Sequence, residues 1–164
     1  MERDLATGVP DPVWPAGCRA RRARRDIDEE LLHALNEASF ADHWGYTPTP
    51  YDEWLHWLLE LGEPDPSLWF VAEADGRPAG IALCRRAAAE PDCGWVSTLG
   101  VLREFRGRGI GSALLHHAFG AFRDRGLVRA GLGVDAENTT GAVRLYERAG
   151  MRIVHRHDLW ERPV

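Results

Sequence analysis

Hydrophobic residues recur at helical spacing early in the chain. Asp26, followed by Glu29, is typical of the capping box that opens a helix. The apolar positions that then repeat every three or four residues are Leu31, Leu35 and Ala38. A second helix is predicted to start at Thr49-Pro50 and to end before Pro64, since Thr can cap a helix and Pro fits its first turn.

After residue 67 the hydrophobic pattern changes to that of β-strands with two further helices between them. The segments predicted to be strands are 68–74, 78–86, 94–102, 128–136 and 151–160. The predicted helices run from the Gly-rich segment 105–111 to about Arg125, and from Asn138 or Thr139 to Gly150. Asp75-Gly76 is a typical hairpin turn between the first two of these strands.

The N-terminal segment has no comparable pattern. Residues 1–16 contain three Pro and no periodicity, which is typical of a flexible tail or linker. Segment 18–24 is either a basic edge strand or a phosphate-binding segment; we favour the edge strand because exposed charges protect strand edges. The resulting order, β-α-α-β-β-β-α-β-α-β, predicts one mixed α/β sheet of about six strands.

Composition narrows the class of protein. A chain of 164 residues suits one domain, and a net charge of −5 argues against nucleic-acid binding. No apolar run approaches the roughly 20 residues that span a bilayer, and no signal-peptide pattern is present. Three Cys without a Cys-x-x-Cys spacing argue against a disulfide framework or a structural zinc site. We therefore expect a cytoplasmic protein that binds neither nucleic acid nor membrane.

The most specific chemical signal lies where the strand at 94–102 passes into a helix. Residues 106–111 read Arg-Gly-Arg-Gly-Ile-Gly. Glycine lets the backbone approach a ligand, and a helix N-terminus offers unpaired N–H groups, so this segment predicts a phosphate cradle. It is not a P-loop, because the chain has no Lys, and Ser112 stands where the dinucleotide fingerprint needs Gly.

Arg106-x-x-Gly109-x-Gly111 matches the Arg/Gln-x-x-Gly-x-Gly/Ala signature of the GCN5-related N-acetyltransferases. Segments 97–101 and 134–151 also resemble that family's cofactor-facing strand and second motif, with Met151 where Phe is commoner. The resemblance implies one domain of this family at 17–164, with a mixed twisted sheet of about six or seven strands flanked by about four helices. The C-terminal half is most similar to the second domain of tandem acetyltransferases such as mycothiol synthase.

The resemblance further implies an acetyl-CoA site. Backbone groups of Leu99 and Val101 would pair with the pantetheine arm at a strand bulge near Gly100, and the Gly-rich segment would hold the pyrophosphate. The full set of cofactor-binding residues that it implies is Leu99, Gly100, Val101, Arg106, Gly107, Arg108, Gly109, Ile110, Gly111, Ser112 and Asn138.

The reaction implied by the resemblance is direct acyl transfer to an amine. A backbone N–H near Leu99 would polarise the carbonyl oxygen, and Tyr146 would be the general acid for the leaving thiolate. The alternative for Tyr146 is simple packing of a helix face. No residue stands out as the base; the candidates are Asp92, Glu73, His155 and His157.

The acceptor pocket is implied to lie between the first two helices and the last strands. The candidate substrate residues are His43, Trp44, Tyr46, Trp95, Ser97 and His157. Residues 26–66 carry eleven acidic residues and no Arg. Either these form an acidic, aromatic wall that favours a cationic amine, or they are solvated helix faces.

The sequence therefore predicts an acetyl-CoA-dependent N-acetyltransferase that acts on an amine of a small molecule or peptide, as a monomer or homodimer. We expect no metal, because His116-His117 diverge on a helix and lack a third ligand. The alternatives are a noncatalytic acyl-CoA-binding sensor and a protein-interaction domain on the same fold.

Overall fold

The computed structural model describes residues 1–43, 45–60, 64–135 and 141–156. Its strands are β1 (Glu2–Asp4), β2 (Cys18–Arg22), β3 (Trp69–Ala74), β4 (Arg77–Arg86), β5 (Cys93–Val101) and β6 (Arg129–Leu132). Its helices are α1 (Glu29–Phe40), α2 (Tyr51–Glu60), α3 (Ile110–Arg123) and α4 (Ala142–Arg148). Short 3-10 helices occupy Pro66–Leu68 and Arg103–Phe105.

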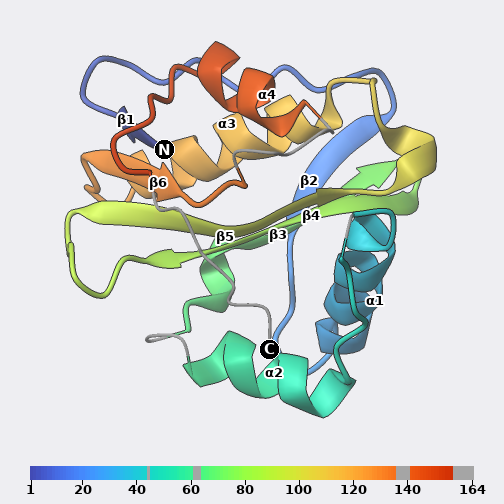
Figure 1. The fold of residues 1–164 in the computed structure, drawn as a ribbon. Helices are drawn as coiled ribbons and strands as arrows, with labels where there is room; N and C mark the ends of the chain where they lie inside the picture. Colours follow the sequence, from blue (N-terminus) through green and yellow to red (C-terminus); the bar gives the residue numbers. More distant parts are fainter. Residues whose placement is uncertain (44, 61–63, 136–140, 157–164) are drawn as a thin grey trace.

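The six strands form one mixed sheet in the order β1-β6-β5-β4-β3-β2. Neighbouring strands are antiparallel except β5 and β6, which run parallel. Helices α3 and α4 lie on one side of the sheet, and α1 and α2 lie on the other (Figure 1). The predicted fold class and the basic edge strand at β2 are thus confirmed.

Helix α1 begins later than its sequence pattern indicates. The Asp26 N–H donates to Glu29 Oε1 at 2.6 Å, which is half of the predicted capping box. Asp26, however, has a φ of 62° and lies in a turn, so the helix begins at Glu29. The buried Asp28 carboxylate is bound by Arg21 and Arg24, which fixes the entry to the helix.

Two predictions about the ends of the chain are wrong. Within residues 1–16, expected to be a tail, Glu2–Asp4 forms β1 against β6, and Met1 and Leu5 are buried. Residues 151–156 do not form the expected last strand and contribute only an isolated bridge between Arg152 and Glu2. Both differences have one physical cause. β1 pairs with β6 and occupies the edge of the sheet, so residues 151–156 are left with only the bridge to Glu2. The rest of that predicted strand lies outside the described residues.

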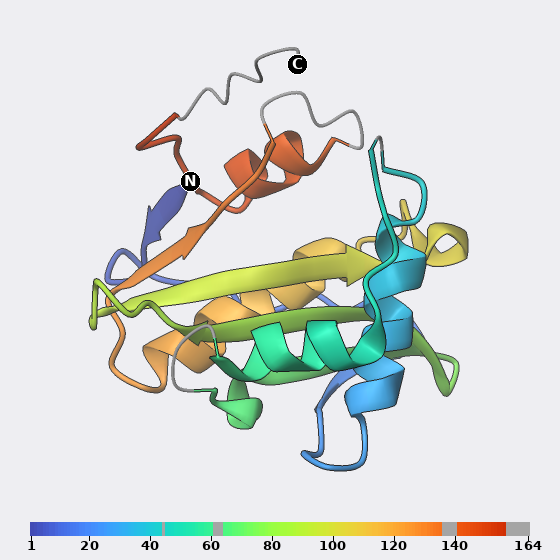
Figure 2. The same ribbon diagram turned by 60° about the horizontal axis from the view of Figure 1, so that its bottom comes forward.

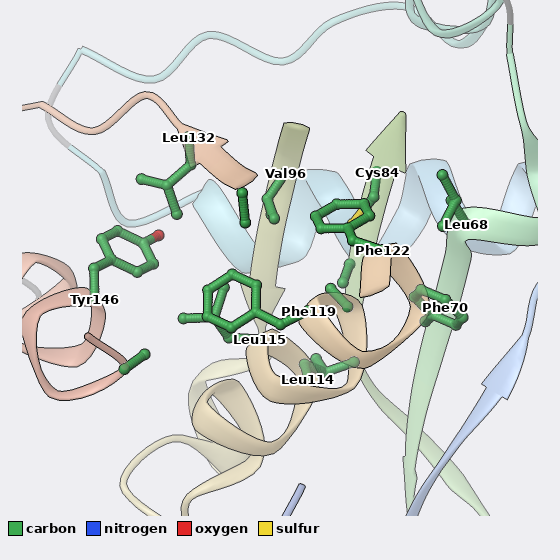
Figure 3. Close-up of a cluster of buried hydrophobic side chains, with 14 of the residues drawn as sticks. Leu68, Phe70, Cys84, Val96, Leu114, Leu115, Phe119, Phe122, Leu132 and Tyr146 are labelled. Atoms are coloured by element: carbon green, nitrogen blue, oxygen red, sulfur yellow. The ribbon is translucent and has the colours of Figure 1, made fainter. Parts of the chain in front are cut away.

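The core is divided by the sheet. On one side, the buried face of α3 packs against β3, β4 and β5 through Phe70, Phe119 and Phe122 (Figure 3). On the other side, α1 and α2 cover Trp69, Val71 and Ile81. Both faces of β3 and β4 are therefore buried, which accounts for their continuous apolar runs.

Candidate functional site

Strands β5 and β6 diverge and leave a fork. β5 pairs with β4 from Gly94 to Val101, whereas its parallel pairing with β6 covers only Cys93 to Val96. Figure 2 shows β6 rising away from β5 beyond this point. The second half of β5 thus has a strand on one side only among the described residues. Apart from the Val101 carbonyl, which accepts from Arg106 Nε, its backbone groups on the β6 side are available to an extended ligand.

The irregularity that accompanies this fork is at Ser97. Leu83 pairs with Thr98 and Cys84 with Val96, so Ser97 is the extra residue of a β-bulge. The prediction of a bulge near Gly100 is wrong, because Gly100 pairs regularly with Ile81. A Cβ at Gly100 would lie 2.8 Å from the Cβ of Ser39, so α1 packs closely on the strand there.

Backbone direction along β5 identifies the groups that face the fork. The Leu102 N–H donates to Ala79 O at 3.0 Å, and therefore points toward β4. Because successive residues of a strand point their backbone groups to opposite sides, Gly100 also faces β4, while Leu99 and Val101 face the fork. This is the geometry that the predicted pairing of Leu99 and Val101 with a pantetheine arm requires.

The Gly-rich segment ends at an uncapped helix. Gly107 and Gly109 have φ values of 74° and 90°, in the left-handed region that L side chains rarely adopt. Gly109 is the N-cap of α3 and no side chain caps this end; the first helical bond runs from the Ala113 N–H to Gly109 O. The N–H groups of Ile110, Gly111 and Ser112 are thereby left to a ligand, and the positive end of the helix dipole favours an anion.

The two arginines of the segment have protein partners. The Arg106 guanidinium binds Asp42 at 2.6 Å and the Ser39 carbonyl at 2.8 Å, and its Nε donates to Val101 O at 3.0 Å. Arg106 thus ties the end of α1 to the end of β5. Arg108 is exposed and its guanidinium carbon lies 5.4 Å from the centroid of the Phe105 ring.

Tyr146 lies at the closed end of the fork. Its side chain is 8% exposed, and it extends from α4 with its hydroxyl directed toward Leu132 and Val96 (Figure 3). These two residues are the last pair of the β5–β6 ladder. Burial raises the pKa of the Tyr146 hydroxyl, which therefore stays protonated through the neutral range. Asn138, the predicted contact to the cofactor arm, lies outside the described residues.

A cavity of about 260 Å³ lies on the other side of the sheet, between its surface and helices α1 and α2. It reaches the bulge at Ser97 and Thr98. The other residues that line it are Asn36, Thr49, Trp54, Trp57, Leu58, Pro64, Trp69, Leu83, Cys84 and Arg85. Because it reaches from α2 to the bulge at the start of the fork, this cavity is the candidate acceptor site.

The structure separates the predicted substrate residues. Ser97 lines the cavity, whereas Trp95 packs over Gly131 of the neighbouring strand. His43 packs edge-on against Phe40, with ring centroids 5.0 Å apart. The Tyr46 hydroxyl is buried beside Glu37, and burial, together with the nearby Glu37 carboxylate, raises its pKa to about 12. Trp44 and His157 lie outside the described part of the chain.

Two candidates for the base are occupied elsewhere. Glu73 binds Arg19 and Arg21 of the edge strand, and this holds the pKa of its carboxyl below the usual value. Asp92 is bound by Arg129, which lowers its pKa likewise. Both lie away from the fork, beside β2 and at the start of β5. His155 lies in the exposed segment that follows α4, and His157 is not described.

Residues that the sequence did not single out also line the cavity. Trp69 and Arg85 come from adjacent strands, and Asn36 comes from α1. Their only signal in the sequence is position on a strand or helix, which does not distinguish them from packing residues. Within the described ranges no group of three or more His, Cys, Asp or Glu side chains could hold a metal ion. No helix in these ranges is long and apolar enough to cross a membrane.

Residues 29–151, which include α1, the fork, the Gly-rich segment and α4, match the model of the acetyltransferase (GNAT) family. The chain belongs to this family. The GNAT fold and the resemblance seen in the sequence motifs are thus confirmed.

Relatives of known name are longer than this chain. It is 38% identical over 161 residues to a mycothiol acetyltransferase of Thermobispora bispora. The matched region covers 92% of this chain and 52% of the relative. It is 36% identical to the mycothiol acetyltransferase of Streptomyces griseus over 94% of this chain and 49% of the relative. A GCN5-related N-acetyltransferase from Sphaerobacter thermophilus superimposes with a TM-score of 0.79 at 37% identity, covering 92% of this chain and 46% of that structure. The chain thus spans about half the length of these relatives.

Proposed function

We propose that this chain transfers an acetyl group from acetyl-CoA to an amine of a small molecule or peptide, by direct attack within a ternary complex. The observation that carries the proposal is the fork between β5 and β6, which leads to the uncapped N-terminus of α3. An extended arm fits the backbone edge at Leu99 and at the Val101 N–H, since the Val101 carbonyl already accepts from Arg106 Nε. A pyrophosphate fits the N–H groups that follow Gly109.

The loop has room for such a group. A Cβ built on Gly107 would meet no atom within 4 Å, and one built on Gly109 would meet only Pro15, at 3.9 Å. The backbone of this turn is therefore exposed and not packed against the rest of the protein, as close approach of a pyrophosphate requires. Family membership supports acetyl-CoA as the donor.

When bound, acetyl-CoA supplies a thioester whose C–S bond breaks as the acetyl carbon bonds to the amine nitrogen. The N–H of Leu99 faces the fork and would polarise the carbonyl oxygen there. The Tyr146 hydroxyl would donate its proton to the departing sulfur and regain one from water. The amine enters from the cavity at Ser97 and Thr98, and its proton leaves to water in that opening.

Calorimetric titration with acetyl-CoA, followed by a panel of amines with release of free thiol as the readout, tests the proposal. We expect binding in the micromolar range and thiol release that depends on an amine. Binding without release would leave a noncatalytic acyl-CoA-binding module. Absence of binding would overturn the proposal and leave an interaction domain.

Gly109→Trp tests the cradle itself. Its side chain would cover the N-terminus of α3, so we expect acetyl-CoA binding to be lost. Gly76→Trp is the matched control, because Gly76 has a similar φ of 77° and open space around it, in the β3–β4 hairpin. The backbone strain is similar at both turns. A loss of binding in Gly109→Trp but not in Gly76→Trp would therefore be specific to the cradle. Retained binding in Gly109→Trp contradicts the assignment.

A further inference from the structure

The apolar part of the cavity defined above is aromatic. Three tryptophans line it, Trp54 and Trp57 from α2 and Trp69 from β3. Trp54 and Trp69 are buried, but Trp57 is 51% exposed, an unusual position for so large an apolar side chain. The cavity is smaller than the roughly 300–1,000 Å³ of sites for drug-sized ligands. It therefore suits a small molecule with an apolar or aromatic body.

The charge of the cavity is the opposite of that expected from the acidic segment 26–66. No carboxylate lines it among the described residues. Asp28 is bound by Arg21 and Arg24, and Asp42 is bound by Arg106. Glu37 accepts from the N–H of Thr49 at the edge of the cavity but does not line it. Among the described residues this cavity therefore has the expected aromatic wall but not an acidic one.

Arg85 is the one charged side chain that lines the cavity within the described ranges. Its Nε donates to Ser97 Oγ at 3.2 Å, which holds the guanidinium beside the bulge. Its two Nη groups have no partner in the part of the chain that the structure describes. A planar guanidinium with free Nη groups is the geometry that binds a carboxylate through two parallel hydrogen bonds.

We infer that the acceptor is an amine that also carries a carboxylate, and that Arg85 binds this carboxylate while the tryptophans hold the apolar body. The inference rests on the proposed transferase function, and it names the acceptor class for that site. Ser97 is two residues from Leu99, about 7 Å along the strand. An acceptor anchored at Arg85 can therefore place its amine at the fork, and its carboxylate takes no part in the bond changes.

Pairs of acceptors that differ only in the carboxylate test this inference. Phenylalanine and phenethylamine share an aromatic body and a primary amine, and γ-aminobutyrate and propylamine form an aliphatic pair. For the wild-type protein we expect kcat/KM at least tenfold higher for the member with a carboxylate. Phenylpropionate, which lacks the amine, should inhibit competitively against the acceptor.

Arg85→Gln keeps a polar side chain but removes the charge. We expect KM for the carboxylate-bearing acceptors to rise about 10- to 100-fold, with kcat changed much less and with little effect on phenethylamine. Inhibition by phenylpropionate should be lost in the same variant. Arg86→Gln is the matched control, because Arg86 is adjacent, exposed and bound to Pro91 O outside the cavity.

The outcomes distinguish a failure of the acceptor class from a failure of the transferase function. Acetylation of both members of each pair without preference, or an equal loss on both in Arg85→Gln, overturns the inference and leaves the transferase function intact. Acetyl-CoA binding without thiol release for any amine overturns the function, and with it the choice of acceptor. Unchanged acetyl-CoA affinity in Arg85→Gln, measured by calorimetry, is expected because Arg85 lies on the acceptor side of the sheet.

Discussion

Replacing Tyr146 by Phe removes one hydroxyl from the closed end of the fork. The ring is 8% exposed and packs in the core with Leu132 and Val96, so its apolar contacts survive the change. The hydroxyl makes no hydrogen bond to another group of the described chain. We therefore expect the free energy of unfolding to change by less than about 1 kcal/mol.

The effect on the rate should be much larger than the effect on stability. Removal of a general acid typically costs 100-fold or more, so we expect kcat to fall about 100-fold, or about 2.7 kcal/mol of activation free energy. Burial raises the pKa of Tyr146 above its usual value of 10.0. The hydroxyl thus remains mostly protonated up to pH 10. Wild-type activity should decline only above that pH, and Tyr146→Phe should lack this decline.

The assay is thiol release at saturating amine and acetyl-CoA between pH 7 and 10.5, with calorimetry to show that cofactor affinity is retained. Tyr51→Phe is the matched control, since Tyr51 is a half-buried tyrosine of α2 whose ring stacks on Trp54, away from the fork. Turnover by Tyr146→Phe that equals the wild type at every pH would refute the acid role and leave Tyr146 as a packing residue.

Two further predictions concern the scaffold that holds the site. Asp28→Asn should lower the free energy of unfolding by about 2–3 kcal/mol at pH 7, because its buried carboxylate accepts hydrogen bonds from two arginines. Those arginines hold the Asp28 pKa well below its usual 3.8, so the stabilisation is present above pH 3.8 and is lost as the pH falls further. In urea unfolding, the difference in unfolding free energy between wild type and Asp28→Asn should therefore be smaller at pH 3 than at pH 7. An equal difference at both pH values would contradict this role of Asp28. Gly100→Ala should cost about 1–3 kcal/mol in thermal unfolding, because the new Cβ would lie 2.8 Å from the Cβ of Ser39. Gly120→Ala in α3, where a Cβ meets nothing within 4 Å, should instead be neutral or stabilising by up to about 1 kcal/mol, and equal effects would count against close packing at Gly100.

Local patterns in the sequence were sufficient to predict most of the helices and strands. The periodicity of α2 and the apolar runs of β3, β4 and β5 depend on neighbouring residues along the chain, so they predict their elements closely. The Gly-rich turn is also a local signal, because positive φ at Gly107 and Gly109 and the start of α3 involve consecutive residues. β1 could not be predicted in this way. It has three residues, and only pairing with the distant β6 makes it a strand.

The sequence by itself determined the family, the order of the elements between β2 and α4, and the position of the Gly-rich turn before α3, since these depend on motifs and on hydrophobic period. Tertiary structure alone decided where the β5–β6 ladder ends, that the bulge is at Ser97, and that Arg106 binds Asp42. It also decided the charge of the cavity between the sheet and helices α1 and α2. The acidic segment contains the tryptophans of α2, but its Asp28 and Asp42 are bound by arginines from other elements, and the cation at the cavity comes from β4. Such pairings join residues far apart in the chain, and no local pattern in the sequence predicts them.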